Sequence, residues 1–180
     1  MNLGAALSVL GIVLKLASAR KASASEGSRR EDEAETWDVP GGDVGALWGE
    51  ALDALYSWGG GREEGAWPGG PFDCSGFVDA ALREAGAELP WERGWASSAT
   101  MYQALPVQAL EPGEEAPEGA IVFYGTSGKP SHVMLSLGDQ GVIGASGGDS
   151  RTYADDPDAR VKTFSSAWYR ADCIGWAWPW

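Results

Sequence analysis

The spacing of apolar residues changes part-way along this 180-residue chain, and that change constrains the fold more than any other feature. Up to residue 104, apolar residues recur every three or four positions, which predicts helices over 43–56, 74–85 and 97–104. Beyond that point, short apolar runs alternate with turns, which predicts strands at 120–124, 133–137, 142–145, 161–164 and 173–178. Helices followed by sequential hairpins indicate an α+β fold with an antiparallel sheet.

The two longer predicted helices carry boundary signals. Asp43 is a candidate N-cap for the first helix, and the three glycines at 59–61 are expected to end it. The second helix is expected to start at Cys74 and to end at Gly86. Its predicted inward face consists of Phe77, Val78, Ala81 and Leu82.

The first 39 residues differ from the rest of the chain. Residues 1–20 include an apolar run of about 12 residues, shorter than the roughly 20 needed to span a bilayer. We expect a helix that anchors the chain at a membrane, directs export, or docks on a partner or on its own domain. Residues 21–39 are rich in Ser, Ala, Glu and Arg and are expected to form a flexible linker. The folded domain is expected to occupy 40–180.

Charge and composition exclude several kinds of function. Residues 1–30 hold five basic residues and one acidic residue, whereas residues 31–180 hold eight basic and 25 acidic residues. A body that acidic repels phosphate, which argues against nucleic-acid binding. Two cysteines and one histidine are too few for a disulfide framework, a four-ligand zinc site or a His-rich metal centre.

A candidate nucleophile lies in residues 72–78, with the sequence Phe-Asp-Cys-Ser-Gly-Phe-Val. Cys74 falls in the first turn of a predicted helix, where the backbone N–H groups and the helix dipole favour a thiolate. The alternative is a buried structural cysteine. Cys173, in a predicted core strand without a neighbouring base, is expected to be structural.

The single histidine, His132, precedes a predicted strand and lies 58 residues after Cys74. A cysteine nucleophile needs an imidazole within hydrogen-bonding reach, as a base or as the partner in an ion pair. Taken alone, His132 is as readily explained as an ordinary core or surface histidine.

Taken together, these segments resemble the NlpC-type bacterial cell-wall cysteine endopeptidases, a papain-like family. The resemblance covers 43–180. Residues 56–60 (Tyr-Ser-Trp-Gly-Gly) and 72–78 are similar to the family's two motifs around the nucleophile. Residues 117–124 resemble its Pro-Gly-Asp strand without the Asp, and 131–139 resemble its histidine strand and hairpin turn. The implied fold is papain-like, with N-terminal helices packed on an antiparallel sheet.

The resemblance also implies roles for individual residues. Cys74 would form a thioester, and His132 would transfer protons. The Tyr56 hydroxyl and the Ser75 backbone N–H would stabilise the oxyanion, and Trp58 would contact substrate. Asp73 would cap the helix. No metal or cofactor is required by this chemistry.

The family usually places a third polar residue about 12 positions after the histidine, where this chain has Gly144. Asp149 is our preferred substitute for orienting the imidazole. Ser146, a backbone carbonyl or a water are alternatives, and so is an impaired site.

The implied function is cleavage of a stem-peptide amide bond of peptidoglycan, typically between D-glutamate and a diamino acid. The implied location is the cell envelope or the exterior, with a phage-associated, endolysin-like enzyme as a variant. Two other functions fit the same residues: a papain-like amidase or acyltransferase with another substrate, and a domain that binds wall fragments without cutting them.

Overall fold

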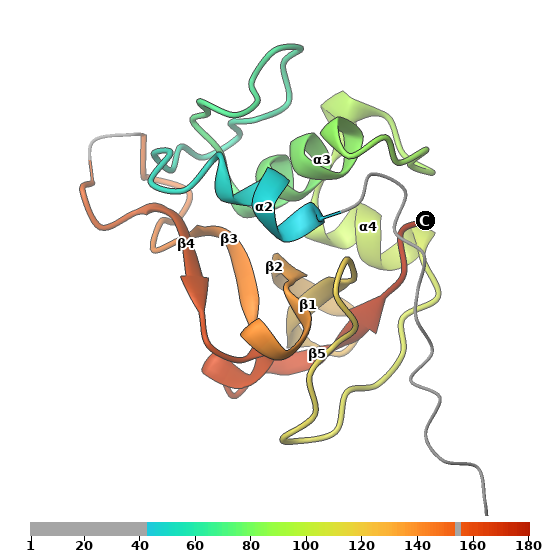
Figure 1. The fold of residues 1–180 in the computed structure, drawn as a ribbon. Coiled ribbons are helices and arrows are strands. Elements are labelled where there is room, and N and C mark those ends of the chain that lie inside the picture. The colour runs from blue at the N-terminus through green and yellow to red at the C-terminus, as the bar shows by residue number, and fades with distance from the viewer. Residues whose placement is uncertain (1–42, 154–155) are drawn as a thin grey trace, which may run out of the picture. The chain divides into compact units, whose positions relative to one another are not determined.

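A five-stranded antiparallel sheet forms the centre of the computed structural model, which describes residues 43–153 and 156–180 (Figure 1). Its strands are β1 (Ile121–Thr126), β2 (Lys129–Ser136), β3 (Val142–Ser146), β4 (Arg160–Phe164) and β5 (Cys173–Ala177), in the order β4-β3-β2-β1-β5. Each neighbouring pair is antiparallel. The predicted sheet and α+β class are therefore confirmed, while the expected N-terminal helix and linker lie outside the described residues.

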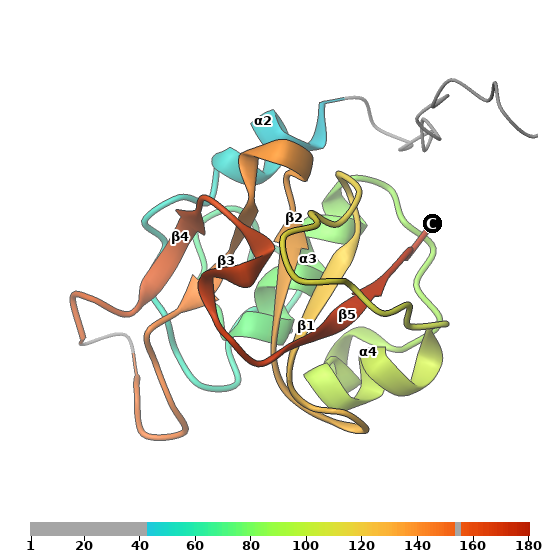
Figure 2. The ribbon, with the colours of Figure 1, turned by 90° about the horizontal axis from the view of Figure 1, so that it is seen from below.

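Three α-helices precede the sheet in the chain: α2 (Val44–Gly49), α3 (Cys74–Glu84) and α4 (Ser98–Ala104). Helices α3 and α4 contact β2, and α3 also contacts β3 (Figure 2). Short 3-10 turns occur at Arg93–Trp95, Gly138–Gln140 and Ala167–Tyr169. No helix within the described ranges is long and apolar enough to cross a membrane.

Side chains alternate between the two faces of the sheet. Val133 and Leu135 join the core that holds the buried face of α3, including Phe77. Met134 belongs to the second core on the opposite face. This alternation fixes His132 on the same face as Met134, one residue away from the helix-facing Val133.

The boundaries predicted for the second and third helices agree with the structure to within one residue. Helix α3 begins at Cys74, and the N–H of Ala87 returns to the carbonyl of Leu82 around Gly86, which has a positive φ of 88°. Helix α4 begins after Ser97, whose hydroxyl accepts the N–H of Thr100 at 3.0 Å. Each helix thus starts after a side-chain N-cap, Asp73 for α3 and Ser97 for α4.

The prediction of a helix over 43–56 is wrong beyond Gly49. The N–H of Asp53 donates to the carbonyl of Val161 at 3.0 Å, and the N–H of Tyr56 donates to Ala159 at 2.9 Å. The chain therefore leaves the helix and pairs with the β4 edge, which supplies partners that a continued helix would not use. Leu55, expected on the buried face, is 43 % exposed.

The start of α3 lies in direct backbone contact with the glycine-rich loop. A Cβ on residue 76 would overlap the carbonyl oxygen of Gly60 and come within 3.2 Å of the Gly61 Cα. Because both neighbours are backbone atoms, neither can rotate away. Only glycine permits α3 to lie this close to the loop.

We predict that Gly76→Ala lowers the free energy of unfolding by about 3 kcal/mol, since a forced overlap in a packed region costs about that much. Gly94→Ala is the control, because a Cβ there meets nothing within 4 Å. Urea unfolding of both variants measures the difference. Equal stability of the two would contradict the close contact.

Candidate active site

Asp73 organises the first turn of α3. Its carboxylate accepts the N–H of Gly76 at 2.7 Å and the hydroxyl of Ser75 at 3.0 Å. It also accepts the N–H of Gly59 at 3.0 Å from the glycine-rich loop. The predicted capping role is confirmed, and Cys74 is the first residue of the helix.

The sulfur of Cys74 lies between the helix start and β2. The backbone N–H groups of Ser75 and Val133 both bind it, and each lowers the pKa of the thiol. Burial acts in the opposite direction and outweighs them, followed by the charge of Asp73, so the pKa rises from 9.0 to about 11. The helix-terminal donor therefore acts in the expected direction, but burial outweighs it and favours the protonated thiol at neutral pH.

His132 lies on β2 beside Val133, opposite Tyr124 of β1. Its side chain is only 8 % exposed, and the imidazole and the Tyr124 ring have centroids 5.7 Å apart. Burial, followed by the positive charge of Arg170, lowers the pKa of His132 from 6.5 to about 4. The Val133 N–H thus ties the sulfur to β2 one residue away from His132. The imidazole itself lies against Tyr124, and no hydrogen bond among the described residues joins it to the sulfur.

Tyr56 borders the same site. Burial, followed by the charges of Cys74 and Asp73, raises the pKa of its phenol, so the hydroxyl remains a proton donor at neutral pH. A Cβ on residue 148 would overlap the Tyr56 ring, so the Gly148 backbone lies directly against it. The Trp58 side chain is 53 % exposed, and the backbone N–H of Trp58 donates to the carbonyl of Thr152 at 2.8 Å.

The profile of the NlpC/P60 family matches residues 53–168, which includes every residue of this site. The chain belongs to the NlpC/P60 family.

Named relatives agree with this assignment. The chain is 34 % identical over 106 residues to peptidoglycan endopeptidase RipB of Mycobacterium tuberculosis, covering 55 % of this chain and 40 % of RipB. It is 36 % identical over 84 residues to peptidoglycan DL-endopeptidase CwlO of Bacillus licheniformis, covering 47 % and 17 % of the two chains. It therefore spans less than half the length of these relatives.

The crystal structure of the NlpC/p60 domain of peptidoglycan hydrolase SagA superposes with a TM-score of 0.50 at 25 % identity. The match covers 76 % of this chain and 97 % of that domain. The α+β architecture described above is thus that of an NlpC/P60 domain.

Gly144 lies where the family usually places its third polar residue, and the side chain of Met134 fills the space beside it. A Cβ on residue 144 would lie 3.1 Å from Cε and 3.2 Å from Cγ of Met134. The Nε2 atom of His132 is buried and has no hydrogen-bond partner among the described residues. The imidazole is therefore held by packing against its neighbours, and no side chain binds that nitrogen.

Asp149 does not take over this role in the structure. Its exposed carboxylate accepts the N–H of Arg151 at 2.7 Å and the guanidinium of the same residue at 2.9 Å. The turn that presents Asp149 directs its carboxylate to its own loop, and no hydrogen bond joins it to His132. Ser146, the other side-chain candidate, lies beside Tyr169.

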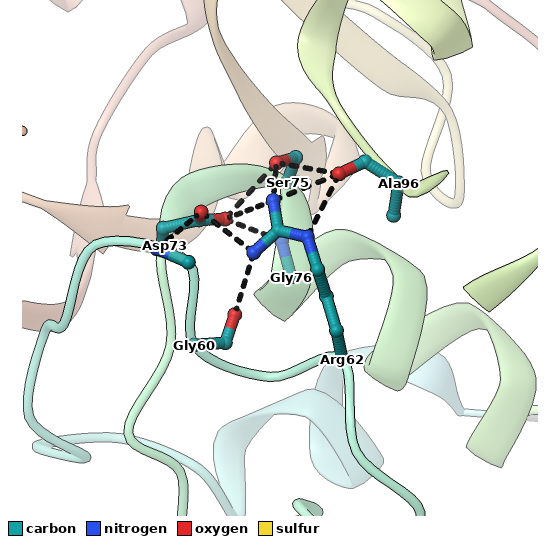
Figure 3. A network of polar contacts seen from close by, with 7 residues as sticks. Gly60, Arg62, Asp73, Ser75, Gly76 and Ala96 are labelled. Atoms are coloured by element: carbon teal, nitrogen blue, oxygen red, sulfur yellow. Dashed lines mark hydrogen bonds and ion pairs between the residues drawn. The ribbon is translucent and has the colours of Figure 1, made fainter. Parts of the chain in front are cut away.

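Arg62 is a residue that the motifs do not predict. Its guanidinium binds the Asp73 carboxylate with Nη1 to Oδ2 at 2.7 Å and Nη2 to Oδ1 at 3.2 Å (Figure 3). Asp73 also bears on Cys74 and Tyr56, so Arg62 belongs to the polar environment of the nucleophile. A lone arginine in a glycine-rich loop gives no periodic or motif signal by which to find it.

The second cysteine and the acidic residues form no further centre. Cys173 lies at the start of β5, and burial raises the pKa of its thiol. Over residues 43–153 and 156–180, no three His, Cys, Asp or Glu side chains are grouped to hold a metal ion.

The lowered pKa of His132 predicts an acid-sensitive fold. In the unfolded chain the imidazole of His132 is protonated below about pH 6.5, whereas in the folded chain it is protonated only below about pH 4. The contribution of the buried neutral imidazole to the free energy of unfolding is therefore fully present above pH 6.5 and is lost as the pH falls from 6.5 to 4. Between pH 7 and pH 4.5, the wild type should lose about 2 kcal/mol more unfolding free energy than His132→Gln. Urea unfolding at both pH values measures this, and equal losses would show that the imidazole is not buried as described.

Proposed function

We propose that this NlpC/P60 domain is a cysteine hydrolase that cleaves a stem-peptide amide bond of peptidoglycan through a thioester on Cys74. The observation that carries the proposal is the binding of the Cys74 sulfur by the Val133 N–H, directly beside His132. RipB and CwlO, which bear peptidoglycan endopeptidase names, support the choice of substrate. The bond between D-glutamate and a diamino acid is the proposed target.

Because the Cys74 thiol and the His132 imidazole are both neutral at rest, we expect His132 to act as a general base. As the sulfur attacks the amide carbon, His132 accepts the thiol proton, and the carbonyl electrons move to the oxygen. The Ser75 N–H and the Tyr56 hydroxyl donate to this oxyanion. The carbon–nitrogen bond then breaks, and the imidazolium returns its proton to the departing amine, which leaves the thioester.

Water completes the cycle. His132 accepts a proton from water as its oxygen attacks the thioester carbonyl, and the same two donors stabilise the second oxyanion. The carbon–sulfur bond breaks, the acid product leaves, and the sulfur is reprotonated by the imidazolium. One water is consumed for each amide bond, and no cofactor takes part. Such an enzyme would act in the cell envelope or outside the cell.

Digestion of purified peptidoglycan tests the proposal, with mass spectrometry of the released fragments. The wild type and Cys173→Ala should release fragments with new stem-peptide termini, whereas Cys74→Ala should release none, because Cys74 is the proposed nucleophile. Cys173→Ala is the matched control for loss of a thiol. Equal fragment release by Cys74→Ala and the wild type would refute the assignment of Cys74 as the nucleophile.

Tyr56→Phe should lower kcat about 100-fold, the usual effect of removing one oxyanion donor, with little change in KM. Tyr102→Phe makes the same atomic change in α4 and serves as the control. Initial rates on a soluble stem peptide measure both. An unchanged kcat in Tyr56→Phe would show that the Tyr56 hydroxyl does not stabilise the oxyanion.

One observation favours a second candidate, a domain that binds wall peptide without cutting it. The unpartnered Nε2 of His132 leaves the base without the group that fixes tautomer and orientation in related triads. Under this alternative, wild-type protein would co-sediment with peptidoglycan yet release no fragments. Release that depends on Cys74 would exclude it.

A further inference from the structure

All five N–H groups of the Arg62 guanidinium donate hydrogen bonds to acceptors within the protein. Nε donates to the carbonyl of Ala96 at 3.0 Å, and Nη1 donates to the carbonyl of Gly60 at 3.2 Å as well as to Asp73. Nη2 donates to the Ser75 hydroxyl at 2.9 Å and to Ala96 at 2.8 Å, in addition to Asp73. With its five N–H groups engaged, Arg62 has no donor left for a substrate anion.

These bonds join three separate segments at one point (Figure 3). Gly60 belongs to the glycine-rich loop, Asp73 caps the nucleophile helix, and Ala96 immediately precedes the N-cap of α4. The side chain is mostly buried, at 21 % exposure, and the Asp73 side chain at 6 %. A planar five-donor fork fits this arrangement, whereas a lysine ammonium has one centre and three donors.

Arg62 also balances the charge next to the sulfur. The charge of Asp73 raises the pKa of Cys74, and the charge of Arg62 lowers it. The other titratable groups at the sulfur are Tyr56, which stays protonated, and His132 beyond Val133. Both are neutral at pH 7, so the carboxylate and the guanidinium are the two charges that act on the thiol there.

We propose that Arg62 is a positioning residue for the nucleophile: by binding Asp73, Gly60 and Ala96 together, its guanidinium fixes the start of α3 and neutralises the carboxylate beside Cys74. This role concerns the reactivity of the thiol itself. Its contribution to turnover rests on the proposed hydrolase function, but its effect on alkylation needs no substrate.

The test is the rate of Cys74 alkylation by iodoacetamide between pH 6 and 11, followed by mass spectrometry of the Cys74 peptide. Arg62→Gln leaves Asp73 uncompensated, so the profile should move up by about one pH unit, a tenfold slower reaction at pH 8. The double variant Arg62→Gln/Asp73→Asn removes both charges and should return the profile to within about threefold of wild type. Arg62→Lys keeps the charge and should leave the profile near that of wild type.

Arg93→Gln is the matched control, because this half-buried arginine donates to the carbonyl of Glu63 and has no hydrogen bond to Asp73 among the described residues. Its profile should equal that of wild type. An Arg62→Gln profile superimposable on that of Arg93→Gln would overturn the proposal. So would a double variant that remains as slow as Arg62→Gln, since charge balance through Asp73 would then not be the cause.

Arg62→Lys also covers the case in which Arg62→Gln does not fold, as judged by thermal unfolding. Its alkylation should match wild type while peptidoglycan release falls at least tenfold, because the ammonium cannot hold Asp73 and Ala96 together. Full release by Arg62→Lys would overturn the positioning role. Failure of wild type to release fragments, with the alkylation shifts intact, would instead refute the hydrolase and leave the thiol effect standing.

Discussion

The site depends on the close contact between the backbone of Gly76 and the carbonyl of Gly60, which brings the start of α3 against the glycine-rich loop. At this distance one carboxylate, that of Asp73, can cap the helix and bind the loop together. The cap in turn fixes Cys74 in the first turn, where β2 supplies an N–H to its sulfur. A side chain at residue 76 would separate the helix from the loop.

Burial decides the charge state of the two reactive groups. The helix terminus and the backbone donors favour a thiolate, but loss of solvent around Cys74 raises its pKa, and loss of solvent around His132 lowers the pKa of the imidazole. At neutral pH the proton therefore rests on the Cys74 sulfur.

Local signals in the sequence predicted the strands, α3 and α4, because capping residues and periodicity are encoded within a few residues. The pairing of Cys74 with His132, which rests on the resemblance, stays a prediction. The helix over 43–56 failed because the β4 edge competes for the backbone of Asp53 and Tyr56. The substitute at Asp149 failed because a turn directs the carboxylate to Arg151. The helix error and the unpredicted role of Arg62 both concern contacts between segments that are distant in the sequence, which a local residue pattern does not encode. The Asp149 error is local, because its partner Arg151 is only two residues away.

Nuclear magnetic resonance of the imidazole tests most directly whether Cys74 and His132 are both neutral at rest. His132 is the only histidine in the sequence, so its ring signals need no assignment. Nitrogen-15 shifts of wild type and Cys74→Ala would be followed from pH 4 to pH 9. We expect a neutral imidazole in both proteins at pH 7, with a pKa of about 4 in the wild type. An imidazolium at pH 7 that disappears in Cys74→Ala would instead reveal a thiolate–imidazolium pair and would refute the neutral resting state.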